Sequence, residues 1–78
     1  MHFTFEAKIM AVQLTLDAAE VRWIAGAARE EAQGDLDAGL KHAAEEGFRR
    51  AAWYYRAIGD TWWAENMDKR AEDALEED

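Results

Sequence analysis

Apolar residues recur at helical spacing from Asp17 onward, and the pattern is interrupted at Gly34 and at Gly59. Residues three and four positions apart lie on one face of a helix, so this spacing predicts amphipathic helices. The sequence also contains no proline that would break them. The pattern therefore predicts three helices, over residues 17–33, 36–58 and 61–75, followed by a frayed tail at residues 76–78.

The predicted helix ends carry recognisable signals. Asp17 is a suitable N-cap, and Glu20 follows three residues later, as in a capping box. Gly34 is placed to end the first helix as its C′ residue. Gly59 followed by Asp60 indicates a stop and an immediate new cap, so the last helix begins directly afterwards.

Before Asp17 the sequence alternates with the two-residue period of a strand. A first apolar set comprises Phe3, Phe5, Ala7 and Ile9. A second set, shifted by one residue, comprises Val12, Leu14 and Leu16. The shift requires a bulge or a turn near Met10, and we predict one bulged strand over residues 3–16, with a hairpin as the alternative.

A lone strand leaves unpaired backbone groups along both edges. No second strand pattern follows in the sequence, so the simplest solution is antiparallel pairing with the same strand of a second copy, through Val12, Leu14 and Leu16. A chain of 78 residues without cysteine has no disulfides to support its small core, and self-association would supply the missing burial. We therefore predict a single domain of mostly α (α+β) class, assembled as a homodimer that shares a β-ribbon.

The formal net charge is −8, with 17 acidic against nine basic residues. An acidic surface repels phosphate and anionic lipid, so nucleic acid is an unfavourable partner and a basic protein a favourable one. No apolar run of about 18 residues is present, and residues 1–16 lack the pattern of a signal peptide. We expect a cytoplasmic protein that has no membrane contact.

Three of the four tryptophans lie off the apolar stripes of their predicted helices. These are Trp23, Trp53 and Trp62, whereas Trp63 lies within a stripe. Large apolar side chains left exposed commonly mark contact surfaces. We predict that the three off-stripe indoles anchor contacts with a second copy or with another protein, together with Arg49 and Arg56, because Trp, Tyr and Arg dominate such sites.

The middle helix carries a small residue at every fourth position, namely Gly39, Ala43, Gly47 and Ala51. Two glycines in a helix interior cost about 2 kcal/mol relative to alanine, so a compensating contact is expected. Close crossing by another helix is the natural candidate. The alternative is that an alanine-rich sequence produces such a row by chance.

Other functions are less well supported by the residues. Arg49, Trp53 and Arg56 interleave as in single-strand nucleic-acid sites, but Glu45 and Glu46 can neutralise Arg49 and Arg50 at i,i+4 spacing.

His42 and Glu45 are too few ligands for a metal site. The chain has no serine, no cysteine and no phosphate-binding loop, so we expect neither an enzyme nor a cofactor. The acidic residues of the last helix and tail leave DNA mimicry open as a further alternative.

Two resemblances bear on function. The stretch Val12–Asp17, followed by Glu20 and a helix to Gly34, resembles the opening of ribbon-helix-helix proteins, over about residues 10–58. That resemblance implies a dimeric strand-helix-helix unit in which Ala11, Gln13 and Thr15 would face DNA. The strand departs from the family in lacking basic readers. In composition, the chain looks like small acidic accessory proteins of phages that infect actinobacteria, many of which bind a host or defence protein.

From these observations we predict a non-enzymatic protein–protein interaction module, in the manner of a phage accessory protein that modulates a host or defence protein. The alternative is a DNA-binding transcription regulator of ribbon-helix-helix type, and an acidic DNA mimic is the third hypothesis.

Overall fold

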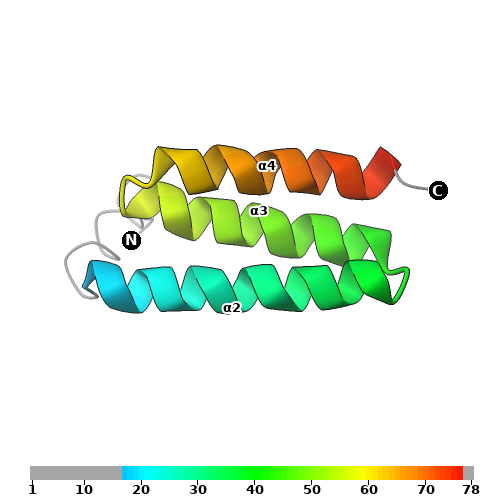
Figure 1. Cartoon of the computed structure of the whole chain (residues 1–78), viewed down its shortest axis with the longest axis horizontal. Coiled ribbons are helices and arrows are strands. Elements are labelled where there is room, and N and C mark those ends of the chain that lie inside the picture. Colours follow the sequence, from blue (N-terminus) through cyan, green and yellow to red (C-terminus); the bar gives the residue numbers. More distant parts are fainter. Residues whose placement is uncertain (1–16, 77–78) are drawn as a thin grey trace, which may run out of the picture.

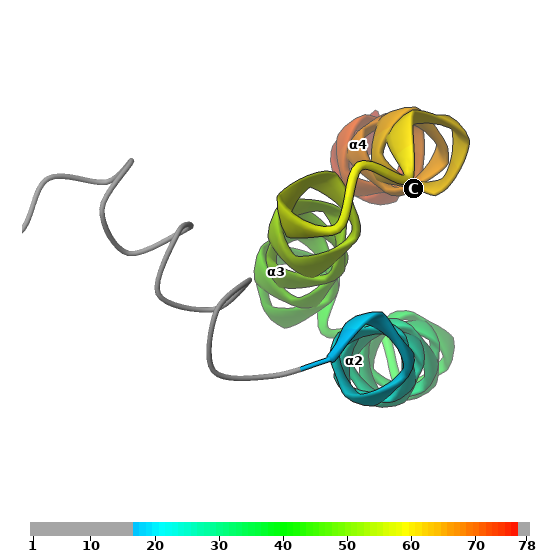
Figure 2. The same ribbon diagram turned by 90° about the vertical axis from the view of Figure 1, so that its left-hand side faces the viewer.

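The computed structural model describes residues 17–76, and this part of the chain is a bundle of three antiparallel helices (Figure 1). The helices are α2 (Ala18–Asp37), α3 (Lys41–Ala57) and α4 (Thr61–Glu76). Helix α3 packs along both of the others, and the end-on view shows α2 and α4 flanking it (Figure 2).

The α+β class predicted from the sequence is wrong, because 88% of the described residues are helical and none of them forms a strand. The strand predicted over residues 3–16, with its pairing residues Val12, Leu14 and Leu16, lies outside the described residues. The shared β-ribbon of the predicted homodimer is built from this strand, so no part of the ribbon falls within the described residues.

Helix α2 begins at a capped N-terminus. Asp17 has the extended backbone of an N-cap residue, with φ −74° and ψ 163°. Its Oδ1 atom accepts a hydrogen bond from the Glu20 N–H at 2.8 Å. This bond satisfies one of the backbone donors that the first helical turn leaves free.

The turn between α2 and α3 lies later than the sequence predicted. Gly34 does not end α2, which continues to Asp37, and α3 begins at Lys41. The left-handed residue is Gly39, with φ 81°. Its N–H donates to the Leu36 carbonyl and the Leu40 N–H donates to the Asp35 carbonyl, which is the Schellman pattern. The helix gains from the extra turn because Leu36 packs against the core.

The turn between α3 and α4 uses the same device. Gly59 has φ 78°, its N–H donates to the Arg56 carbonyl, and the Asp60 N–H donates to the Tyr55 carbonyl. Asp60 then caps α4, because its Oδ1 atom accepts from the Trp63 N–H at 3.4 Å. A single Gly–Asp pair therefore ends one helix and begins the next.

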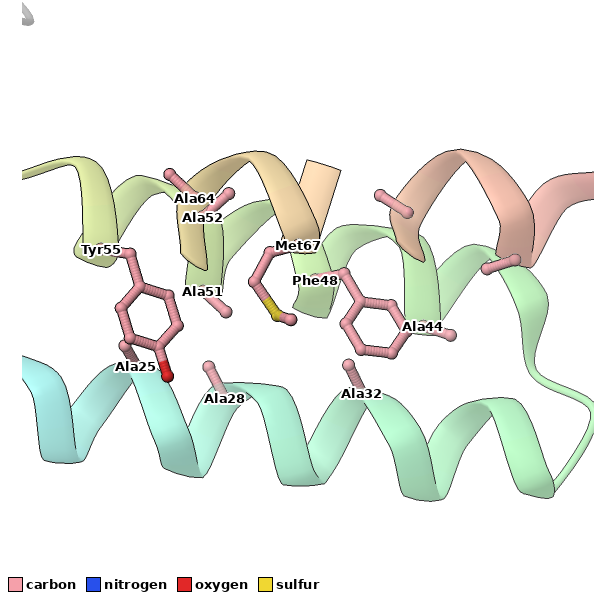
Figure 3. Packing of buried hydrophobic residues seen from close by; sticks show 12 residues of the cluster. Ala25, Ala28, Ala32, Ala44, Phe48, Ala51, Ala52, Tyr55, Ala64 and Met67 are labelled. Atoms are coloured by element: carbon pink, nitrogen blue, oxygen red, sulfur yellow. The ribbon is translucent and has the colours of Figure 1, made fainter. Parts of the chain in front are cut away.

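The core consists mainly of alanine, with a few large side chains between the helices. Phe48, Met67 and Val21 are the largest fully buried side chains of the described residues. Phe48 and Tyr55 extend from α3 beside Met67 of α4, over the alanines of α2 (Figure 3). Small residues on the facing surfaces allow the helices to approach closely, and no charged side chain in residues 17–76 is buried.

Helices α2 and α3 approach each other closely at Gly47. A Cβ atom added there would lie 2.8 Å from the Cβ of Ala32 and 3.3 Å from its Cα. Of the small residues predicted to form a crossing, Gly47 and Ala51 are buried, whereas Ala43 is exposed. Gly39 belongs to the turn before α3 and takes no part in the helix crossing.

Candidate partner-binding surface

The most exposed large apolar side chain of the described residues is Trp23, on the side of α2 that points away from the bundle. It is 76% exposed, whereas Val21 and Ala25 are fully buried. Each of these two residues lies two positions from Trp23, which corresponds to about 200° around a helix. The indole is therefore directed into solvent by the helical phase of α2, and packing within residues 17–76 leaves it largely uncovered.

Helical spacing places several small and acidic residues on the same side of α2 as Trp23. We call this surface the α2 outer face, and it comprises Ala19, Trp23, Gly26, Ala27, Glu30, Gly34 and Asp37. A Cβ atom added at Gly26 or at Gly34 would meet nothing within 4 Å. Each glycine costs about 1 kcal/mol in helix stability relative to alanine, and no contact in residues 17–76 accounts for that loss.

The two arginines of α2 lie to one side of the outer face. Arg22 pairs with Asp60 at 3.6 Å, and the guanidinium of Arg29 lies 4.6 Å from the ring centre of Trp63. Both arginines are therefore engaged toward α4. The outer face itself keeps only the carboxylates of Glu30 and Asp37, so its charge is negative.

A second exposed indole, Trp62, lies at the start of α4. It is 65% exposed, and its ring meets that of Trp63 edge-on at a centroid distance of 4.9 Å. Trp63 in turn stacks on Tyr55 at 5.4 Å and lies under the guanidinium of Arg29. Trp62 therefore covers one edge of an aromatic cluster that joins the three helices, whereas no ring contact of Trp23 is found within residues 17–76.

The basic and aromatic patch predicted on α3 is largely occupied by internal contacts. Arg49 bonds to Glu45 at 3.2 Å, and Arg56 bonds to Asp68 of α4 at 2.7 Å. Trp53 is only half-buried and meets Tyr54 edge-on at 5.1 Å. Because both arginines are paired with carboxylates, this surface offers less to a phosphate backbone than its sequence suggests.

Two hollows lie between the helices. One, of about 120 Å³, opens between α2 and α4 above Phe48, and its rim includes Gln33, Arg70 and Asp73. The other, of about 150 Å³, lies between α2 and α3 beside Gly47.

Within residues 17–76 no group of three or more acidic or histidine side chains is arranged to hold a metal ion. Every helix in this range is too short or too polar to span a bilayer.

Comparison of the chain with protein-family models, with curated proteins and with solved structures finds no match.

Proposed function

We propose that this protein is a non-enzymatic interaction module that docks another protein on the α2 outer face. The observation that supports the proposal is the 76% exposure of Trp23 on a surface made otherwise of small and acidic residues. Trp62, which is 65% exposed near the start of α4, is a second anchor for such a partner. Helices α2 and α4 begin at the same end of the bundle (Figure 1).

The energetic reason is the size of the indole. A tryptophan side chain presents about 200 Å² of surface, and burial gains roughly 25 cal/mol per Å². Covering the exposed part of Trp23 would thus contribute on the order of 3–4 kcal/mol, which is the range of an interface hot spot. A partner that covers this residue gains a large share of its affinity from one contact.

The surface charge narrows the choice of partner. The α2 outer face carries carboxylates and no base, so it repels nucleic acid and favours a positively charged protein. A basic partner is also what an acidic DNA mimic would capture, and competition by duplex DNA tests that special case. The composition suggests an accessory protein of phage type. A host or defence protein as its partner remains a prediction.

Site-specific photo-cross-linking tests the proposal. Trp23 and Trp62 would each be replaced by p-benzoylphenylalanine in the cells that make the protein, and Glu72, which is exposed on α4, would serve as the matched control position. We expect one protein to be cross-linked from position 23, and from position 62 if both indoles contact it, but not from position 72. Equal labelling of unrelated proteins from all three positions would contradict a specific docking surface.

A further inference from the structure

We propose that the α2 outer face takes a lysine- or arginine-rich amphipathic helix of the partner, seated over Gly26 and Gly34 beside the indole of Trp23. This inference rests on the proposed function and adds the chemical class and shape of the segment that is bound.

The shape of the α2 outer face suits a second helix. Within the chain, a Cβ atom added at Gly47 would lie 2.8 Å from the Cβ of Ala32. This contact shows how a glycine lets a second helix approach the backbone. Gly26 and Gly34 provide the same opening on the outer side, where an added Cβ meets nothing within 4 Å. They are separated by about 12 Å along the helix axis, with the exposed side chain of Glu30 between them.

Trp23 completes this shape. It precedes Gly26 by three residues, so its large side chain lies beside the low surface that the glycines leave. The indole is 76% exposed and offers an apolar wall and a π face to a helix lying in that position. A lysine or arginine can pack its aliphatic stem and its cationic group against such a ring.

The charge of the α2 outer face suits a basic segment. Glu30 lies between Gly26 and Gly34 on the same face, and Asp37 follows toward the helix end. Glu20 flanks the face near Trp23. The basic residues of α2 do not offset these acids, because Arg22 and Arg29 are directed toward Asp60 and Trp63.

These charges disfavour a second copy, an anionic membrane and a nucleic acid as occupants of this helix face. A second copy would bring the same acidic face against itself, so that carboxylates meet carboxylates. An anionic membrane surface or a phosphate backbone would be repelled for the same reason. A basic helix meets the carboxylate of Glu30 between the two glycines, that of Asp37 beyond Gly34, and an aromatic ring at its side.

A binding titration with a defined peptide tests this inference. The probe is a fluorescein-labelled amphipathic helix of alanine, leucine and lysine, and a peptide with glutamate in place of lysine is the matched control. Fluorescence anisotropy would be measured with the full chain at low and at high salt. We expect the lysine peptide to bind, its affinity to fall with added salt, and the glutamate peptide not to bind.

Three variants distinguish specific binding at Trp23 and the two glycines from nonspecific binding of the peptide. Trp23→Ala and the double variant Gly26→Gln/Gly34→Gln should each weaken the lysine peptide by about tenfold or more. The glutamine variant should keep or raise its melting temperature, because glutamine is a better helix former than glycine, so a loss of binding would not reflect unfolding. Leu75→Ala, which changes an exposed apolar side chain of α4 outside the docking surface, should change the affinity by less than about twofold.

The outcomes distinguish this inference from the proposed function. If the glutamine variant binds as tightly as the unmodified chain, the glycine seat is wrong. If the lysine peptide does not bind while position 23 still cross-links to a cellular protein, the docking surface stands and the basic-helix partner is wrong. If the two peptides bind equally, the role of charge is refuted.

Discussion

Replacing Gly47 by alanine should destabilise the bundle, although alanine is the better helix former. The added Cβ would lie 2.8 Å from the Cβ of Ala32 and 3.3 Å from its Cα, and a backbone atom cannot move aside cheaply. Overpacking of this kind costs about 1–3 kcal/mol, whereas the gain in helix propensity is about 1 kcal/mol. The expected net change for Gly47→Ala is therefore a loss of up to about 2 kcal/mol.

Gly26→Ala is the matched control, because the same substitution in the interior of α2 meets nothing within 4 Å. It should stabilise the protein by about 1 kcal/mol. The two variants should then differ by about 1–3 kcal/mol, or by at least about 4 °C in melting temperature for a domain of this size. Thermal and urea unfolding followed by circular dichroism at the helix band would measure the difference. Equal stabilisation by both substitutions would refute a close crossing of α2 and α3 at this position.

Three further substitutions test the fold. Phe48→Ala should lose about 3–5 kcal/mol, because it empties the largest fully buried site, and urea unfolding should show a large fall in midpoint or no folded baseline. Gly59→Ala should lose about 1–2 kcal/mol, because alanine is strained at φ 78°, and a melting temperature equal to that of the unmodified chain would rule out the left-handed turn. Asp17→Ala should lose about 1 kcal/mol with its N-cap bond, and Asp17→Asn, which keeps an acceptor, should retain most of it.

The parts of the fold that follow from local physics were accessible from the sequence. The apolar stripe of the first helix depends only on helical period. Val21, Ala25, Ala28 and Ala32 of this stripe are buried, whereas Ala18 is exposed and Ile24 is half-buried. The stop at Gly59 and the cap at Asp60 depend on adjacent residues, and the structure has both.

The end of α2 was not accessible in the same way. Gly34 and Gly39 are both plausible helix stops, and the choice between them is made by tertiary packing. Leu36 packs on the core only if the helix continues past Gly34, so the turn forms at Gly39. The predicted α+β fold class was wrong for a different reason. It depended on the alternating residues before Asp17, which lie outside the described residues, whereas the described part of the chain is helical.

In the candidate surface, too, some features follow from local spacing and others only from tertiary packing. The exposure of Trp23 follows from its position opposite Val21 and Ala25, which is a local property of α2. The engagement of Arg29 with Trp63 joins residues far apart in the sequence, and no local spacing signals it. That contact matters because it holds the positive charge of Arg29 on the side of α2 toward α4, away from the carboxylates of the outer face.

The most direct test of the account is an NMR titration that follows the indole N–H signals. The chain has four tryptophans, so a ¹H–¹⁵N spectrum resolves the environment of each ring. On addition of the lysine peptide, we predict that the Trp23 signal shifts and that the Trp63 signal, from the ring packed between Tyr55 and Arg29, does not. A bound peptide that leaves the Trp23 signal unchanged would contradict the assignment of the α2 outer face as the docking surface.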